Sequence, residues 1–329
     1  MKVIQLSVPG GPEVLRLVEC ALPEPAANEV RVRAQAIGIS SADILVRNGT
    51  YKWMPPLPAV PGNELVGVID AKGAEVSGLQ LGQKVLVSSR ELPQRGGCYA
   101  QAICVPAAAL YLLPDSIAPH DAVSLPNYQL AGALLYDSGV RKPETIVVYG
   151  ASGGVGSALI QLARSDGIRA IGIVSSEKKR AFARAAGAED VLIRGEDNVR
   201  DEVMALTGAR GVDVVYAMAG KDLMNNLDLL APLGTLVSFS TLGGKPGKDV
   251  FAALRARLGK SLGVRCYSIH TLDQQPVTRR ALMQRAIDLM AAGRLSPPAP
   301  TLLPLAEARR AHELMEAGET LGKLVLVPA

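Results

Sequence analysis

The chain has 329 residues, 48% of them hydrophobic, and its 35 Lys and Arg against 31 Asp and Glu give a formal net charge of +4. This length predicts two domains with sizeable cores, and no apolar run approaches the ~18 residues that a membrane span requires. Aromatic residues make up only 4% and the cations are spread along the chain, which disfavours a membrane protein and a specific nucleic-acid binder.

The cysteines and the first residues suggest a compartment. The four cysteines are isolated and show no disulfide framework, which is typical of a reducing environment. The chain starts directly with a strand-like segment, where a signal or transit peptide would show a different pattern. We therefore expect a cytoplasmic protein.

Two patterns of periodicity divide the chain. Residues 1 to about 118 are rich in Pro, Gly and β-formers, and short alternating segments at 31–37, 65–69 and 84–87 predict a small, irregular β-barrel. From about residue 120, apolar strands alternate with helical stretches, which predicts a parallel, doubly wound sheet because parallel strands need crossover helices. The expected strands are 146–149, 169–173, 190–193, 212–216, 234–239 and 261–268.

The last part of the chain has a different order of elements. A helix at 276–292 closed by Gly293, a strand at 300–304, a helix at 305–317 and a strand at 322–327 are expected. These elements resemble the N-terminal part more than the middle. The predicted division is therefore a first domain at 1–119, a nucleotide-binding domain at 120–268, and a return to the first domain at 269–329.

A glycine-rich turn follows the strand Ile146–Tyr149 and opens the helical segment that begins near Val155. Glycines spaced three apart close such a turn, let backbone N–H groups approach a pyrophosphate, and let the helix pack close to the strand. The helix N-terminus adds partial positive charge. The predicted cofactor contacts in this turn are Gly150, Ser152, Gly153, Gly154, Val155 and Gly156.

The end of the second strand indicates which dinucleotide binds. NAD-binding units carry an acid here for the ribose 2′-hydroxyl, whereas this chain has Ser175 and Ser176 followed by the cations 178–180. Hydroxyls and cations suit a 2′-phosphate. We expect NADPH, with Ser175, Ser176 and Lys179 as contacts; Glu177 is expected to face solvent and part of the cationic run to be an ordinary solvated helix face.

Motifs along nearly the whole chain resemble the quinone oxidoreductase (zeta-crystallin-like) branch of the medium-chain dehydrogenases/reductases. They are Gly10–Leu15, Val60–Glu64, Gly150–Gly156, Val214–Tyr216, Leu236–Phe239 and Gly322–Leu326. The resemblance implies the fold class α/β, a doubly wound parallel Rossmann sheet plus a GroES-like β-barrel domain. It also implies a homodimer that pairs through the strand near 262–268.

Zinc-dependent relatives carry metal ligands that this chain lacks. A Cys is needed where Ser40 and Ser41 stand and a His where Asn63 stands; of the four cysteines of a structural zinc site, only Cys98 and Cys104 are present. We therefore expect no metal. The chemistry that remains is hydride transfer to the C=C bond of a small-molecule electrophile, which is an enone, a quinone or an enoyl thioester, with hydrogen-bond donors stabilising the carbonyl oxygen.

The resemblance suggests two catalytic residues. Tyr51 stands where related enzymes carry a tyrosine, and a phenol, with an ordinary pKa of about 10, stays protonated and donates to an enolate. The alternative is that Tyr51 only lines the cleft beside Trp53. Asn127 is expected to hydrogen-bond the substrate or the cofactor, or else to cap the following helix.

Other predicted cofactor contacts depart from the family pattern or carry an alternative role. Ser40 stands where relatives often carry Asn, and Arg194 stands where they often carry Tyr. Arg194 is expected either near a cofactor phosphate or at the surface. Phe239 and Ser240 are expected near the nicotinamide amide. Lys323 is expected near the cofactor phosphates or at the surface. Two further positions are Asp43, interpreted as structural, and Leu130, where relatives carry a Thr that touches the nicotinamide.

Three functions remain open at this point. The first is an NADPH-dependent enone or quinone reductase. The second is a trans-2-enoyl-CoA or acyl-carrier-protein thioester reductase, for which Lys52 and Arg47 would provide a basic rim. The third is an NADPH-binding sensor or structural protein with little catalysis.

Overall fold

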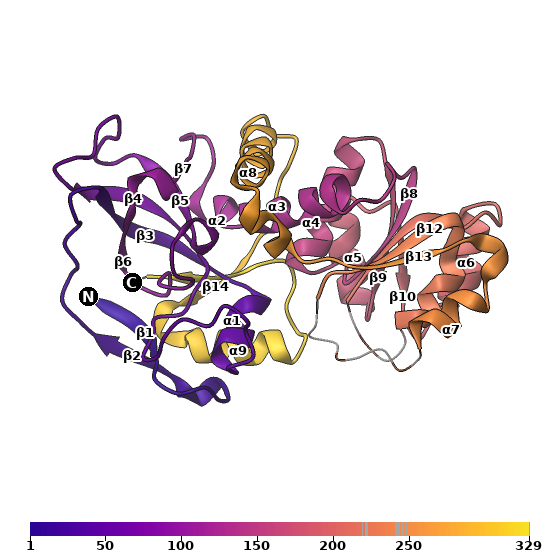
Figure 1. Cartoon of the computed structure of the whole chain (residues 1–329). Helices are drawn as coiled ribbons and strands as arrows, with labels where there is room; N and C mark the ends of the chain where they lie inside the picture. The colour runs from indigo at the N-terminus through magenta and orange to yellow at the C-terminus, as the bar shows by residue number, and fades with distance from the viewer. Residues whose placement is uncertain (219, 221–222, 241–243, 245–246, 248, 329) are drawn as a thin grey trace. The chain divides into compact units, whose positions relative to one another are not determined.

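The structure of the chain is a computed structural model that describes residues 1–218, 220, 223–240, 244, 247 and 249–328 (Figure 1). The chain divides into two compact units. We call unit 1 the residues Met1–Pro126, Ile287–Ala292 and Ala299–Ala329, and unit 2 the residues Asn127–Ala286 and Gly293–Pro298. Within the described residues, no helix is long and apolar enough to cross a membrane.

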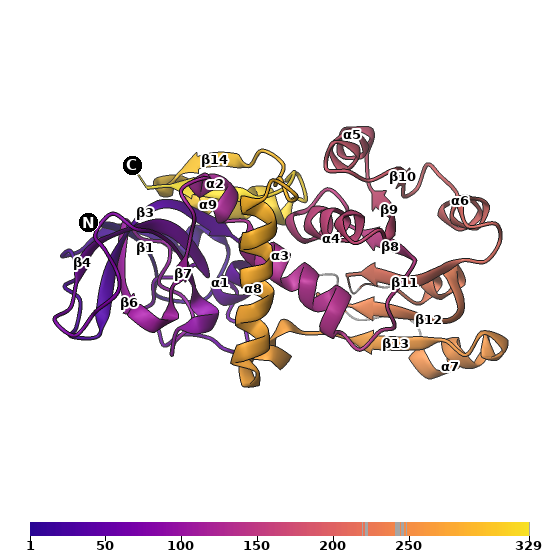
Figure 2. The same cartoon turned by 90° about the horizontal axis from the view of Figure 1, so that it is seen from above.

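Unit 2 is built on a six-stranded sheet in the order β10-β9-β8-β11-β12-β13, and every neighbouring pair is parallel. Figure 2 shows β11, β12 and β13 side by side and pointing the same way. This order, with β8 at the reversal point, is that of a dinucleotide-binding sheet, and all six predicted strands are present. The strands are β8 (Thr145–Tyr149), β9 (Arg169–Val174), β10 (Asp190–Ile193), β11 (Val212–Ala217), β12 (Leu230–Ser238) and β13 (Gly263–Cys266).

The helices of unit 2 connect these strands. α4 packs against β8 and β9, and α5 against β9 and β10, over an apolar core that includes Val147, Ile171, Val215 and Leu236. Such branched side chains fit the buried faces of parallel strands. The helices are α3 (Leu125–Gly132), a π-helical turn η4 (Ala133–Asp137), α4 (Gly154–Ser165), α5 (Glu177–Ala185), α6 (Val199–Leu206), a 3-10 helix η5 (Leu223–Leu229), α7 (Val250–Arg255) and α8 (Pro276–Ala291), whose last residues belong to unit 1.

Unit 1 is centred on β3, which pairs with β4 along one edge and with β6 and β15 along the other. The pairing follows the open path β14-β15-β3-β4-β5-β7, and β1 and β2 form a separate hairpin. The strands are β1 (Lys2–Leu6), β2 (Leu15–Glu19), β3 (Glu29–Ile39), β4 (Glu64–Lys72), β5 (Lys84–Ser88), β6 (Ala102–Pro106), β7 (Tyr111–Leu112), β14 (Thr301–Pro304) and β15 (Leu324–Val327).

Segments from both ends of the chain build unit 1. β15 lies antiparallel to the second half of β3, and Figure 1 shows the yellow C-terminal segment among the indigo N-terminal strands. The core contains Val30 and Ile37 of β3, Leu65 of β4, and Leu324 and Leu326 of β15, all at most 1% exposed. The helices of unit 1 are α1 (Ser41–Arg47), α2 (Pro119–Ala122) and α9 (Ala308–Glu316).

Candidate active site

The glycine-rich turn in unit 2 joins β8 to α4. Gly150 takes a φ of +69°, a conformation that favours glycine, and its carbonyl accepts a hydrogen bond from the N–H of Gly153 at 2.9 Å. Gly153 is the extended N-cap of α4, and Gly154, Val155 and Gly156 form the first turn of that helix. The N–H groups of this first turn have no partner within the helix, so they are available to an anion.

Two close contacts explain why glycine is required in the turn. A Cβ at Gly156 would lie 2.2 Å from the carbonyl oxygen of Gly150, and one at Gly154 would lie 2.4 Å from Nδ2 of Asn127. The structure therefore brings the Asn127 amide to the glycine turn. Asn127 is the third residue of α3, so the alternative that it caps this helix is wrong, and a hydrogen bond to the substrate or the cofactor stays the prediction.

The end of β9 gathers the residues predicted to recognise the 2′-phosphate. Ser176 caps α5 by accepting a hydrogen bond from the N–H of Lys179, and Nζ of Lys179 donates to Oγ of Ser175 at 2.9 Å. Ser175 is exposed. A hydroxyl and an ammonium group thus lie together at the carboxyl end of the strand that follows the glycine turn, where a dinucleotide places its ribose.

The charged residues of α5 next to Lys179 make other contacts or face solvent. Arg180 donates to Asp197 at 2.6 Å and to Glu177 at 3.0 Å, while Lys178 is exposed. Glu177 points to solvent as predicted, with 69% of its side chain exposed. The guanidinium of Arg180 is already neutralised by two acids, so Lys179 is the cation of this run that the structure places beside the serine hydroxyls.

Three further predicted contacts follow other strands of the same sheet. Arg194 comes directly after β10, is exposed, and its N–H donates to the carbonyl of Val174 at 2.8 Å. Burial raises the pKa of Tyr149, at the end of β8, to about 12, and the Arg194 charge opposes that rise. Phe239 and Ser240 come directly after β12 and are half-buried. All three therefore lie at the carboxyl edge, on which ligands of such sheets bind.

Unit 1 contains a buried cluster of polar groups between α1 and β15. Ser40 caps α1, and its N–H and Oγ both donate to Asp43, at 2.7 and 2.9 Å. Asn63 donates through Nδ2 to the other oxygen of Asp43 at 2.7 Å. Lys323 forms an ion pair with Glu64, and both side chains are 4% exposed. The structural role predicted for Asp43 is therefore confirmed.

Charge explains how this cluster is stable inside the unit. Burial raises the pKa of Asp43, whereas bonds from Ser40, the Lys323 charge and the bond from Asn63 lower it. Burial lowers the pKa of Lys323 to about 8, and Asp43 acts against that shift. Lys323 is thus the ammonium that faces both buried carboxylates, and the alternative of a surface role for Lys323 is wrong.

Asn63, which stands where the zinc-dependent relatives carry a His, follows a turn residue but does not form the turn itself. The residue with the left-handed conformation is its neighbour Gly62, at a φ of +99°. The amide of Asn63 instead links Asp43 to Ser89, whose hydroxyl donates to Oδ1 at 2.6 Å. The Asn63 side chain therefore holds the buried Asp43 in place.

Tyr51 lies in the loop that follows α1. Its N–H donates to the carbonyl of Leu45 at 3.1 Å, and its side chain, 8% exposed, packs against Leu6 and Val46. The ring centroid of Trp53 lies 5.6 Å from that of Tyr51, and Lys52 Nζ lies 5.4 Å from the Trp53 ring. Ser40, Tyr51 and Lys323 thus belong to unit 1, and the other predicted site residues to unit 2.

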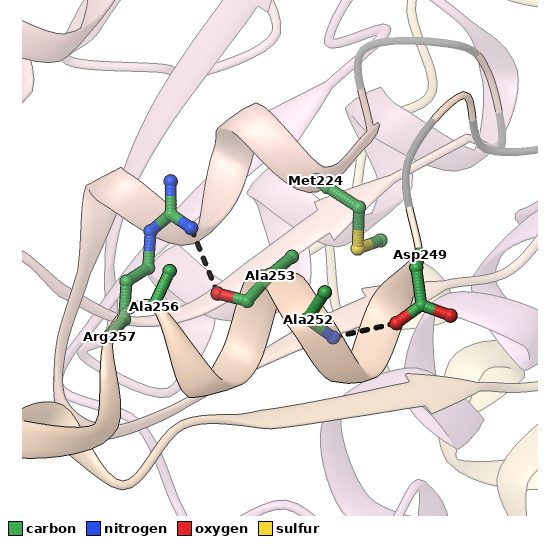
Figure 3. A pocket seen from close by; sticks show the side chains of 6 residues that line it. All are labelled: Met224, Asp249, Ala252, Ala253, Ala256 and Arg257. Atoms are coloured by element: carbon green, nitrogen blue, oxygen red, sulfur yellow. Dashed lines mark hydrogen bonds between the residues drawn. The ribbon is translucent and has the colours of Figure 1, made fainter.

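A hollow of about 360 Å³ lies between α7 and η5 of unit 2 (Figure 3). Its lining consists of Met224, Asp249, Ala252, Ala253, Ala256 and Arg257. Asp249 caps α7 by accepting from the N–H of Ala252, and Arg257 donates to the carbonyl of Ala253. None of the predicted site residues lines this hollow, so we do not assign the active site to it.

Comparison with known proteins agrees with this arrangement. Residues 26–115 match the alcohol dehydrogenase GroES-like domain and residues 154–282 the family described as zinc-binding dehydrogenase. The chain is 34% identical over 330 residues to a quinone oxidoreductase of Pseudomonas aeruginosa, covering 99% of both chains. The chain belongs to the quinone oxidoreductase family. The predicted pairing of a GroES-like domain with a Rossmann sheet is thereby confirmed.

Solved quinone oxidoreductases have the same fold. The Pseudomonas syringae enzyme is 31% identical and superposes with a TM-score of 0.87 over 99% of each chain. The Escherichia coli enzyme, solved as a complex with NADPH, is 28% identical with a TM-score of 0.86 over the full length of both.

The residues of this family member do not fit the metal in the family description. Zinc sites use Cys, His or free carboxylates. The polar cluster of unit 1 offers hydroxyls, an amide and two acids that are already engaged, Glu64 with Lys323 and Asp43 with Ser40 and Asn63. Within the described residues, no three His, Cys, Asp or Glu side chains gather to hold a metal ion.

Proposed function

We propose that this member of the quinone oxidoreductase family reduces the C=C bond of an α,β-unsaturated carbonyl compound or of a quinone, without zinc. The chain is an NADPH-dependent oxidoreductase, as its quinone oxidoreductase relatives indicate. The observation that carries the proposal is the combination of a dinucleotide turn with a unit 1 cluster in which Glu64 pairs with Lys323 and Asp43 accepts from Ser40 and Asn63, a donor set that does not suit zinc.

The cofactor is NADPH, and the residues at the end of β9 fit it. Gly156 has no Cβ to collide with the Gly150 carbonyl, so α4 starts directly against the turn and the N–H groups of its first turn are open to the pyrophosphate. Lys179 and the Ser175 hydroxyl, 2.9 Å apart, would hold the 2′-phosphate, and the exposed Arg194 at the end of the next strand would add a second cation. When bound, NADPH supplies the hydride.

The protein must stabilise the negative charge that develops on the carbonyl oxygen of the substrate. We assign this role to Tyr51, whose phenol donates a hydrogen bond to that oxygen and transfers a proton to it. The loop that carries Tyr51 is held by backbone bonds to α1 and by packing on Leu6 and Val46, so the donor is fixed before substrate arrives. Asn127, beside the glycine turn, orients the cofactor.

NADPH oxidation at 340 nm against a small panel tests the proposal. The panel contains a quinone, a linear enone, a cyclic enone and crotonyl-CoA, with NADH run in parallel. We expect turnover of a quinone or an enone, with NADPH preferred. Crotonyl-CoA as the best substrate would contradict the proposal in favour of thioester reduction, and NADPH binding without turnover would favour the sensor.

Tyr51→Phe tests the proton donor. Losing one positioned donor is expected to lower kcat by about 100-fold while the affinity for NADPH stays unchanged, because general acid catalysis is typically worth that much. The matched control is Tyr136→Phe in unit 2, which removes a phenol that donates to Asp166. Equal rates for Tyr51→Phe and wild type would show that Tyr51 only lines the cleft.

The assembly and compartment complete the proposal. β13 is the last strand of the unit 2 sheet, and its residues are half-buried or exposed. An open edge of this kind pairs readily with a second copy, so we propose a homodimer through β13.

The four cysteines are free, which is consistent with a cytoplasmic protein.

A further inference from the structure

Arg47, the last residue of α1, is a buried guanidinium with 2% of its side chain exposed. Nε donates to the carbonyl of Gly10 at 3.0 Å, and Nη2 donates to Oδ1 of Asn48 at 2.6 Å. Both terminal nitrogens also donate to the carboxylate of Glu316, at 3.0 and 2.5 Å. A two-armed pair of this kind fixes orientation as well as position.

The partners of Arg47 bring three separate segments together. Gly10 belongs to the N-terminal loop, Asn48 opens the loop that carries Tyr51, and Glu316 ends α9. The N–H of Gly10 returns a bond to the carbonyl of Arg47 at 2.9 Å. The loop after α1 also lies directly against the N-terminal loop, because a Cβ at Gly49 would meet Pro9 at 2.8 Å.

A second buried pair connects Arg47 to the other end of α1. His312 of α9 lies with Nδ1 3.5 Å from Arg47 and with Nε2 3.1 Å from the hydroxyl of Tyr99, and neither ring is exposed. Since Arg47 only donates, Nδ1 accepts and the ring proton is on Nε2. Asp43, at the start of α1, is close enough to act on Tyr99: burial, followed by the Asp43 charge, raises the pKa of Tyr99.

Asp43 and Arg47 are four residues apart, so they share one face of α1. α1 is therefore clamped at both ends by buried charged groups, through Asp43 at its start and Arg47 at its end. The chain leaves this clamped helix directly into the Tyr51 loop. Only three residues lie between this fixed helix end and Tyr51, so the loop has little freedom left.

We propose that Arg47, held by Glu316 of α9, is a positioning residue that fixes the Tyr51 loop in its catalytic geometry. The inference rests on the proposed function for the role of Tyr51, and on the contacts above for the brace itself. The segment 305–316 would thereby influence the reaction through Tyr51 although its side chains take no part in the chemistry.

Trp53 allows the brace to be tested without any assay of activity. It is the single tryptophan of the chain, its ring centroid lies 5.6 Å from that of Tyr51, and it is 37% exposed, so its emission reports the order of this loop. In Glu316→Gln we expect acrylamide quenching of Trp53 to rise by about twofold, because a loop with fewer fixed contacts opens more readily. Glu313→Gln on the same helix, whose partner is the exposed Arg309, is the matched control and should quench like the wild type. Unchanged quenching in Glu316→Gln would overturn the proposal.

Kinetics test the link to catalysis. We expect Glu316→Gln to lower kcat by roughly tenfold with the affinity for NADPH unchanged, because small misplacements of a catalytic group are costly. In the Tyr51→Phe background the same substitution should have little further effect on kcat, since both changes act through one group. Full additivity of the two losses would overturn the positioning role.

A wrong assignment of the proton donor would give a different result from a wrong assignment of the Arg47–Glu316 brace. If Tyr51→Phe turns over like the wild type, Tyr51 is not the proton donor, and raised quenching in Glu316→Gln would still support the brace. Arg47→Lys provides a second variant that keeps the charge and loses the two-armed contact; it should also raise Trp53 quenching, and wild-type quenching in this variant would count against the brace.

Discussion

The two units hold their candidate site residues by different means. In unit 2 the backbone defines the site: Gly150 turns the chain with a positive φ, and Gly156 lets α4 approach to within contact of that turn. In unit 1 buried charges define it: Asp43, Lys323 and Arg47 hold α1 and the Tyr51 loop from within.

This difference has consequences for stability and for change. A turn made of backbone tolerates no added side chain, but it has no buried charge to lose. A site held by buried ions is sensitive to any substitution that leaves one partner alone, because a buried charge without its partner is expensive. Substitutions in the two units should therefore reduce stability for different reasons: a steric clash in the unit 2 turn and an unpaired buried charge in unit 1.

The largest expected effect is that of Lys323→Met in unit 1. It leaves the carboxylates of Glu64 and Asp43 buried without their ammonium, which should lower the free energy of unfolding by about 3–5 kcal/mol. Chemical denaturation measures the change, with Lys142→Met at an exposed position as the control. Addition of Glu64→Gln should recover part of the loss. A loss below that of the control would contradict the account of a charge-held unit 1.

Gly156→Ala tests the backbone-held site in unit 2. The added methyl would lie 2.2 Å from the Gly150 carbonyl oxygen, so the turn must open; we expect a loss of about 2–3 kcal/mol in stability together with weakened NADPH binding. Gly259→Ala, where the added methyl meets no atom within 4 Å, is the control. Fluorescence titration with NADPH and thermal unfolding follow both properties. Wild-type affinity in Gly156→Ala would show that the turn does not need this close approach.

The buried His312 of unit 1 should make the stability of the protein depend on pH. Burial, with the Arg47 charge, lowers the pKa of His312 to about 4, below the ordinary value of 6.5. Between these values the unfolded chain binds a proton that the folded chain does not, so this contribution to stability is present above pH 6.5 and is lost as the pH falls toward 4. The loss should reach about 2.5 kcal/mol by pH 4.5.

The free energy of unfolding is measured at several pH values from 7.5 to 4.5. This range covers most of the fall expected between the ordinary pKa of 6.5 and the lowered pKa of about 4. His312→Gln should show a shallower dependence than the wild type, whereas His120→Gln, at a side chain 51% exposed, should keep the wild-type slope. Identical slopes for His312→Gln and wild type would mean that the buried imidazole does not remain neutral.

The local patterns of the sequence were sufficient for unit 2. The predicted strand 146–149 is β8 (Thr145–Tyr149), and Ser175 and Lys179 lie together at the end of the next strand. Strand periodicity, glycine spacing and helix capping act over a few residues, so a sequence displays them directly. The same holds for Asp43, whose capping contact with Ser40 spans three residues.

The interior of unit 1 was decided by tertiary structure alone. Arg47, predicted as part of a basic rim, is buried against Glu316, which is 269 residues away in the chain. Lys323, assigned from sequence to the phosphates or the surface, is buried against Glu64, 259 residues away. A charged side chain shows no local sign of its partner, because only the folded sheet, in which β15 returns beside β3, removes both charges from water and makes them pair.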